Sequence, residues 1–286
     1  MPYPRLILLT TLAMIAFAAN SLLCRAALKH TGIDAASFTA IRLVSGAMML
    51  WLLANIGRGN RTGSGNWLSA FALFVYAAGF SFAYVSLPAA TGALLLFGAV
   101  QATMIGHGIR AGERLLKLQI MGLVFALAGL VGLLLPGLAA PPIFGSALML
   151  ASGIAWGVYS LRGKGAGDPL WVTAGNFMRA VPIAAASSAL MAGHFSLDRA
   201  GFCYALASGA LTSGVGYSIW YTVLPALKSA KAATVQLSVP VIAALGGVLW
   251  LGEPITPRLL LSSLAIIGGI ALVILEQQRA GGAGQG

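Results

Sequence analysis

The chain has 286 residues, of which 59% are hydrophobic and only 8% are charged, and its mean hydropathy is +0.90. A soluble domain carries about a quarter of its residues as charges, so this composition excludes a water-soluble enzyme and predicts an integral membrane protein. The formal net charge is +11. Because the basic residues fall in short gaps between apolar runs, they indicate membrane topology rather than a nucleic-acid partner.

Ten apolar stretches follow one another along the chain, each long enough to cross a bilayer core of roughly 30 Å as a helix. The first resembles a secretory leader, but we expect it to be retained because it has a counterpart later in the chain. After residue 278 the apolar pattern ends, which predicts a disordered tail over 279–286. The expected helices span residues 6–29, 34–56, 67–85, 89–109, 115–135, 143–161, 170–192, 201–224, 230–251 and 258–276.

The distribution of Lys and Arg between these helices predicts the orientation. Four lie in one set of connections: Arg25, Lys29, Arg199 and Arg258. The connections on the other side carry eleven: Arg5, Arg58, Arg61, Arg110, Arg114, Lys117, Arg162, Lys164, Lys228, Lys231 and Arg279. Since cytoplasmic loops are enriched in basic residues, both termini are predicted to be cytoplasmic.

Several short segments recur at a nearly constant offset. Residues 15–22 align with 154–161 at an offset of 139, and Arg42 aligns with Arg179 at 137. The Gly79-Phe80-Ser81 segment returns at Gly216, and the Gly112-Glu113 turn returns at Gly252. This pattern predicts two homologous halves of five helices, residues 1–137 and 138–278. Because five is odd, the second half enters the bilayer from the opposite face, as in the inverted repeats of secondary transporters.

These features resemble the EamA family of the drug/metabolite transporter superfamily, and within it the bacterial aromatic amino acid exporters. The resemblance rests on ten helices in two halves, on the Leu-Pro after the third and eighth helices, and on the run from Pro240 to Thr256 that includes Gly252-Glu253-Pro254. The first half departs from the pattern, since Val100 stands where the second half has Pro240. The resemblance implies export of amino acids and related metabolites across the cytoplasmic membrane.

The spans offer amides and aromatic rings as candidate substrate contacts. All six acidic residues lie at helix ends or in connections, which disfavours a buried carboxylate for a cationic drug or a proton. A zwitterionic amino acid needs donors, acceptors and an apolar wall, and neutral groups supply all three. The predicted binding residues are Asn20, Tyr76, Phe80, Gln101, Trp156, Tyr159, Tyr217, Trp220 and Gln236.

Each of these residues also has a structural interpretation. Amides within spans also join helices by hydrogen bonds, and the rings also serve in plain packing. Arg42 and Arg179 are candidate partners for a substrate carboxylate, or else structural groups near helix ends that extend toward the headgroups. The two cysteines have no metal-site spacing, so we expect no metal and no cofactor.

Together these observations predict an all-α, multi-pass protein of the bacterial cytoplasmic membrane that acts as a monomer and is not an enzyme. The expected function is export of aromatic and other hydrophobic amino acids by alternating access. A multidrug transporter or a sugar-phosphate-type transporter of the same superfamily is the alternative, although the latter requires several cations in the cavity.

Overall fold

The computed structural model describes residues 2–56, 62–112, 116–137, 140–163, 166–227 and 235–283, and within these ranges every regular element is a helix. The π-helical segment Ser208–Val215 joins α8 to α9, so that these three elements form one continuous run. The helices are α1 (Tyr3–His30), α2 (Ala35–Ile56), α3 (Trp67–Tyr84), α4 (Ala89–Arg110), α5 (Lys117–Leu134), α6 (Ile143–Gly163), α7 (Pro169–Leu190), α8 (Arg199–Ala207), α9 (Gly216–Val223), α11 (Ser238–Leu251) and α12 (Pro257–Ala283).

Seven of the described helices, α1 to α6 and α12, are long and apolar enough to cross a membrane. The expected helix over 230–251 corresponds to α11, although its first residues lie outside the described residues. Glu113 of the predicted Gly-Glu turn also lies outside them. At the other end of the sequence, α12 continues to Ala283. It therefore extends into residues 279–283 of the segment that we expected to be disordered.

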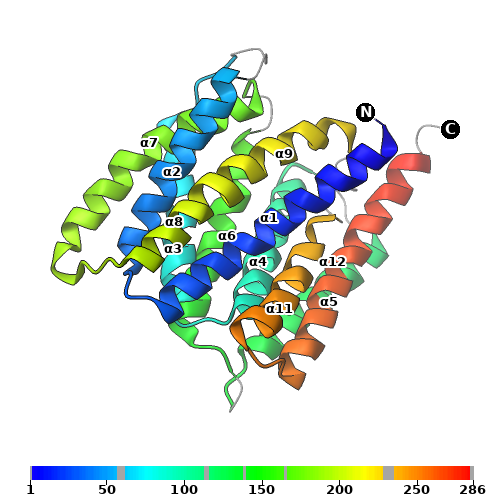
Figure 1. Ribbon diagram of the computed structural model, residues 1–286. Helices are drawn as coiled ribbons and strands as arrows, with labels where there is room; N and C mark the ends of the chain where they lie inside the picture. The colour runs from blue at the N-terminus through cyan, green and yellow to red at the C-terminus, as the bar shows by residue number, and fades with distance from the viewer. Residues whose placement is uncertain are drawn as a thin grey trace.

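The helices pack as a bundle with one pair at each side (Figure 1). α2 packs on α7 at one side and α5 packs on α12 at the other. Between these pairs, α6 contacts α3 and α4, and α1 contacts the α8–α9 run and α11. The start of α1 and the end of α12 lie at the same end of the bundle in Figure 1.

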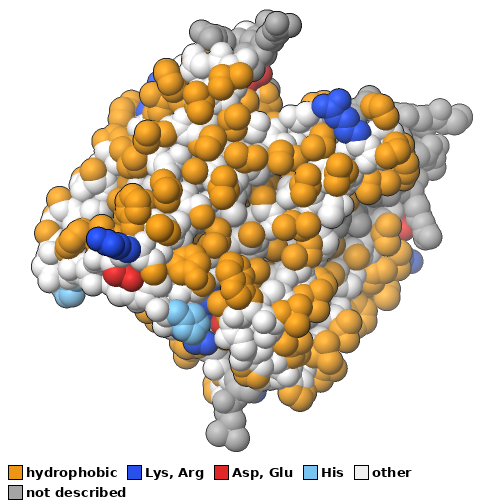
Figure 2. All heavy atoms as spheres, in the orientation of Figure 1, with side chains coloured by type: hydrophobic (Ala, Val, Ile, Leu, Met, Phe, Trp, Pro, Cys, Tyr) orange, Lys and Arg blue, Asp and Glu red, His pale blue; other side chains and the backbone are white. Residues whose placement is uncertain are grey.

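The surface of the bundle is that of a protein immersed in lipid. On the face in Figure 2, hydrophobic side chains cover the middle, and the few charged side chains lie toward the ends of the helices. Large apolar side chains such as Leu249 and Met48 are exposed. A soluble monomer rarely exposes so continuous an apolar surface, so the lipid bilayer is the environment that this fold requires.

Two hydrogen bonds link the connections between helices in a reciprocal way. The backbone N–H of Asp34 donates to the carbonyl of Ser196, and that of Asp168 donates to the carbonyl of Thr62, each at 3.0 Å. Asp34 and Asp168 are 134 positions apart, and so are Thr62 and Ser196. The same kind of contact therefore occurs twice, as is expected for two structurally related segments that face each other.

A buried ion pair joins four segments at one end of the bundle. Arg25 on α1 lies 3.0 Å from the carboxylate of Glu253, between α11 and α12. The same guanidinium donates to the carbonyls of Tyr84 and Val85 at the end of α3, at 2.9 and 3.0 Å. The other carboxylate oxygen of Glu253 accepts from the backbone N–H of Ala89 at the start of α4, at 2.7 Å.

A second arginine lies at the opposite end of α3. Arg162, at the end of α6, donates to Asn66 Oδ1 and to Ser69 Oγ, both at 3.2 Å. Arg162 and Arg25 are 137 positions apart, the same offset that relates Arg42 to Arg179. Among the described residues, a guanidinium therefore meets each end of α3, and the Arg25 guanidinium also contacts the Glu253 carboxylate, which accepts from the start of α4.

We expect the Glu253→Gln variant to lose much of its stability, because the Arg25 guanidinium would remain buried opposite a neutral amide. Removal of one partner of a buried ion pair costs about 3–5 kcal/mol, which thermal unfolding in detergent would detect as a clearly lower Tm. The double variant Arg25→Met/Glu253→Met is the control and should recover most of the loss. Equal Tm values for Glu253→Gln and the wild type would contradict this role.

The hydrogen bond from the backbone N–H of Ser196 to the Asp34 carboxylate should depend on pH. Burial alone would raise the pKa of the Asp34 carboxyl, but hydrogen bonds from the backbone N–H groups of Ser196, Ser37 and Ala36 outweigh it and lower that pKa below its usual value. A depressed folded pKa contributes stability above the unfolded pKa of about 3.9, and this contribution is lost as the pH falls through the folded pKa. The Tm difference between wild type and Asp34→Asn should therefore be largest at pH 6 and shrink below about pH 4. A pH-independent difference would contradict this assignment.

Candidate functional site

A cavity of about 630 Å³ lies between α1, α3, α4, α6, α7 and the α8–α9 run. Its lining includes all nine predicted binding residues, but neither Arg42 nor Arg179. The nine are Asn20, Tyr76, Phe80, Gln101, Trp156, Tyr159, Tyr217, Trp220 and Gln236. They come from residues 1–137 and from residues 138–278, the two segments that the sequence predicts to be homologous halves.

Aromatic rings form a continuous wall of this cavity. The ring of Trp156 stacks on Tyr159 and on Tyr217, with centroids 5.3 and 5.4 Å apart. On its other side Trp156 contacts Tyr76 at 4.7 Å, and Trp220 packs edge-on against Phe17 at 6.0 Å. Offset and edge contacts of this kind leave ring faces and edges available to a planar or apolar ligand.

Asn20 presents one half of its amide to the cavity. Its carbonyl oxygen accepts from the hydroxyls of Ser208 and Thr212, at 2.7 and 3.1 Å. Both hydroxyls belong to the π-helical segment, in which the shift to i→i+5 hydrogen bonds is a feature often found at functional sites. No hydrogen bond is recorded among the described residues for the Asn20 NH₂ group, which therefore remains available as a donor to a ligand.

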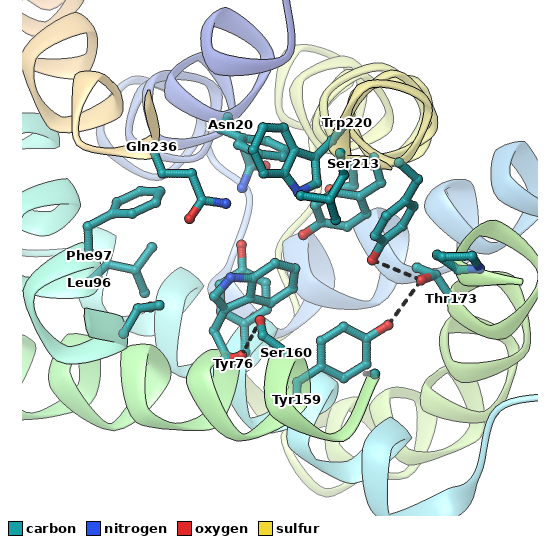
Figure 3. A pocket seen from close by; sticks show the side chains of 18 of the residues that line it. Asn20, Tyr76, Leu96, Phe97, Tyr159, Ser160, Thr173, Ser213, Trp220 and Gln236 are labelled. Carbon is teal, nitrogen blue, oxygen red and sulfur yellow. Dashed lines mark hydrogen bonds between the residues drawn. The ribbon is translucent and has the colours of Figure 1, made fainter. Parts of the chain in front are cut away.

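Other polar groups around the cavity lack protein partners. Among the described residues, the buried Gln101 Nε2 and Ser213 Oγ make no hydrogen bond. The side chain of Gln236 extends toward the cavity from the segment before α11 (Figure 3). Since an unsatisfied buried polar group costs about 1–3 kcal/mol, these atoms are suited to a polar ligand that enters the cavity.

The structure adds residues of α7 that the sequence argument missed. Thr173 donates to the hydroxyl of Tyr221 at 3.1 Å and accepts from that of Tyr159 at 3.4 Å (Figure 3). Asn176 donates to the same Tyr159 hydroxyl at 3.4 Å. Asn176 is an amide within a span, so the argument that selected Asn20 also applies to it. Tyr221 lies in the repeated segment, whereas nothing in the sequence distinguishes Thr173.

The two arginines within spans, Arg42 and Arg179, differ in their surroundings. Arg42 is only 1% exposed and lies behind the cavity wall, where Nη2 donates to the hydroxyl of Tyr76 at 2.9 Å. Its guanidinium also lies over the rings of Tyr76 and Phe80, at 5.2 and 4.8 Å from their centroids. Arg179 instead donates to the carbonyls of Ser64 and Gly175 and is absent from the cavity lining, so its contacts are structural.

The described lining carries no acidic or basic side chain. Across all the described residues, no group of three His, Cys, Asp or Glu side chains lies close enough together to hold a metal ion. The cavity extends to the connection between α6 and α7, lined there by Gly163, Gly167 and Pro169. The Arg25–Glu253 ion pair lies at the other end of α3 and outside this lining.

Comparison with known proteins identifies the family. The EamA-like transporter family matches residues 143–275. An uncharacterized protein of Pseudomonas aeruginosa is 58% identical over 275 residues and is covered over 96% of each chain. The protein belongs to the EamA family.

More distant relatives of this EamA protein carry functional names. The threonine/homoserine exporter RhtA of Escherichia coli K12 is 33% identical over 144 residues, which is 47% of this chain and 48% of the relative. An uncharacterized transporter of Archaeoglobus fulgidus is 24% identical over 223 residues, 73% of this chain and 76% of the relative. One crystal structure matches with a TM-score of 0.68 and 18% identity over 98% of this chain and 99% of its own, so it shares the fold. The matched family is therefore one of membrane transporters rather than enzymes.

Glycines on α6 determine how closely the aromatic wall of this EamA protein approaches α4. A Cβ at Gly157 would lie 2.8 Å from the Cβ of Thr103, and one at Gly153 would lie 2.6 Å from that of Ala99. Real Cβ atoms do not approach so closely. Trp156 and Tyr159 lie on the same stretch of α6, so the close contact of α6 with α4 fixes their position at the cavity.

We expect the Gly157→Val variant to lower the Tm, because the added methyl groups would push α6 away from Thr103. Overpacking of this kind costs about 1–3 kcal/mol. Gly106→Val is a matched control, since a Cβ at Gly106 on α4 would meet no atom within 4 Å. Thermal unfolding of both variants in one detergent provides the comparison, and equal Tm values would contradict close packing at Gly157.

Proposed function

We propose that this protein exports amino acids with aromatic or other hydrophobic side chains across the bacterial cytoplasmic membrane. The observation that carries the proposal is the cavity, whose lining is aromatic and neutral but includes buried amide and hydroxyl groups without partners. A ligand site of about 300–1,000 Å³ accommodates a small molecule, and the cavity volume of about 630 Å³ falls in that range.

The lining supplies each group that a zwitterionic amino acid requires. The NH₂ groups of Asn20 and Gln101 are donors for its carboxylate, and the hydroxyls of Tyr159 and Tyr221 and the carbonyl oxygen of Gln236 are acceptors for its ammonium. The rings around Trp156 form a wall for an aromatic or aliphatic side chain. A lipophilic cation would require a carboxylate, and the described lining has none.

The similarity to the threonine/homoserine exporter RhtA supports amino acids as the substrate class. The aromatic composition of the cavity leads us to propose larger and less polar substrates than threonine or homoserine. Such a difference is expected between relatives that share about a third of their residues over half of their length, because substrate choice depends on a few side chains of the site.

Transport by alternating access follows if residues 1–137 and 138–278 form an inverted repeat of ten spans. The reciprocal contacts of Asp34 with Ser196 and of Asp168 with Thr62 support this arrangement, since equivalent loops exchange the same hydrogen bond. Two antiparallel copies have two conformations of similar energy, open to opposite sides. A monomer is sufficient, because the cavity lies within one chain.

We assign the described conformation to the state that faces the cytoplasm. The excess of Lys and Arg predicts that both termini and the connection between α6 and α7 are cytoplasmic, and the cavity extends to that connection. At the opposite end the ion pair of Arg25 and Glu253 joins α1, α3, α4 and the start of α12. We propose that this ion pair holds the outer end closed.

Proteoliposomes loaded with L-phenylalanine test the proposal directly. We expect saturable exchange of labelled phenylalanine, and a Trp156→Ala variant should lose it by about tenfold or more, because the central ring of the cavity wall is removed. Trp250→Ala is the matched control, since Trp250 is 56% exposed on the outer surface of α11. Equal rates for these two variants would contradict the cavity as the substrate site.

The same vesicles identify the driving force. The described lining contains no titratable carboxylate, so we expect exchange that is insensitive to an imposed pH gradient. Accumulation of phenylalanine that follows the gradient would instead require proton coupling. Transport of a sugar phosphate or of a lipophilic cation in place of phenylalanine would support the alternative substrates.

A further inference from the structure

Arg42 is a buried cation whose hydrogen-bonding capacity is largely unused. A guanidinium has five N–H donors, yet Nη2 donates only to the Tyr76 hydroxyl, and Nε and Nη1 have no partner among the described residues. No carboxylate of the described residues forms an ion pair with the Arg42 guanidinium. The side chain is nevertheless 1% exposed, so a full positive charge lies in the protein interior without a counter-charge.

Other arginines of the chain indicate what a purely structural guanidinium looks like here. Arg25 pairs with Glu253 and donates to two carbonyls. Arg179, the repeat counterpart of Arg42, donates to the carbonyls of Ser64 and Gly175. Arg42 has only two ring faces and one hydroxyl, which offset a small part of the cost of burying an ion. Packing alone therefore gives no reason to retain an arginine at this position.

Tyr76 connects this charge to the cavity. Its ring lies over the Arg42 guanidinium and contacts Trp156 on the side of the cavity wall. Because the Tyr76 oxygen accepts from Arg42, its own hydrogen is free to donate elsewhere, and no acceptor for it is recorded among the described residues. Hydrogen bonds in such a chain polarise one another, so the Tyr76 hydroxyl is a stronger donor than an isolated phenol.

We propose that Arg42, acting through Tyr76, makes the cavity selective for substrates that carry a carboxylate. Arg42 is a positioning residue, because the lining residues Tyr76 and Phe80 separate its guanidinium from the cavity. The substrate anion supplies the missing counter-charge and accepts from the Tyr76 hydroxyl. The proposal rests on the cavity as the substrate site, and it deepens the proposed function by naming the group that is recognised.

The test compares three ligands of similar shape: L-phenylalanine, L-phenylalaninamide and phenylacetate, titrated into the purified protein in detergent. We expect the two carboxylates to bind at least tenfold more tightly than the amide. The Arg42→Gln variant should weaken binding of both carboxylates by about tenfold or more, since the nearby charge acts in a medium of low dielectric constant, and should leave the amide unchanged. Arg42→Lys should restore part of the preference because it keeps the charge, and Tyr76→Phe should lose it.

Stability distinguishes this role from a structural one. Removal of an uncompensated buried charge should leave the Tm unchanged or raise it, so Arg42→Gln is expected to bind carboxylates poorly while remaining at least as stable as the wild type. Arg179→Gln is the matched control and should keep the preference for carboxylates. A lower Tm with an equal loss of all three ligands would overturn the proposal in favour of a structural role.

The same three ligands distinguish carboxylate selection by Arg42 from amino acid export. Binding of phenylacetate that depends on Arg42, without binding of phenylalanine, would uphold carboxylate selection and contradict amino acid export. Equal binding of phenylalanine and its amide, unaffected by Arg42→Gln, would overturn carboxylate selection and leave amino acid export standing. A wild-type protein that binds neither carboxylate would overturn both.

Discussion

A bilayer core offers no hydrogen bonds, so each polar atom within it must find its partner in the protein or in a ligand. This constraint explains why the polar residues of so apolar a chain fall into two groups. One group is satisfied internally, as in the ion pair of Arg25 with Glu253, which ties four helical segments together at one end of the bundle. The other group lines the cavity or lies behind its wall, where Gln101, Ser213 and Arg42 retain atoms that have no partner in the described part of the chain.

The two ends of α3 illustrate how residues predicted to be equivalent can have different surroundings in one conformation. Arg25 and Arg162 are 137 positions apart, and each guanidinium meets one end of this helix. Arg25 is fixed by a carboxylate, whereas the contacts of Arg162 within the described ranges, which leave out Glu113, are to the neutral oxygens of Asn66 and Ser69. If the halves form an inverted repeat, the reverse conformation would exchange the environments of Arg25 and Arg162.

Much of the fold and of the cavity could be predicted because two properties can be read from a short stretch of sequence. These are the length of an apolar run and the energetic cost of a polar side chain within it. A helix is recognised from its apolar run, and an amide such as Asn20 within that run is expensive unless it faces a cavity. The ion pair could not be predicted, since its partners are 228 positions apart and Arg25 reads as one more basic residue near a helix end. Neither could the π-helical turn, whose Ser208 and Thr212 hydroxyls donate to Asn20, a residue far away in the sequence.

Arg42 and Arg179 occupy positions that the sequence predicts to be equivalent, and the packing around them differs. Arg179 reaches backbone carbonyls near the end of its helix, but Arg42 is enclosed by aromatic rings that also form the cavity wall. A wall without fixed charges admits a zwitterion without leaving an ion unpaired at the surface of the empty cavity. In our proposal, the Arg42 cation behind that wall adds a preference for an anionic group while it remains shielded from lipid. Burial of the Arg42 guanidinium lowers the stability of the empty protein, and a bound carboxylate would reduce this loss by supplying a counter-charge.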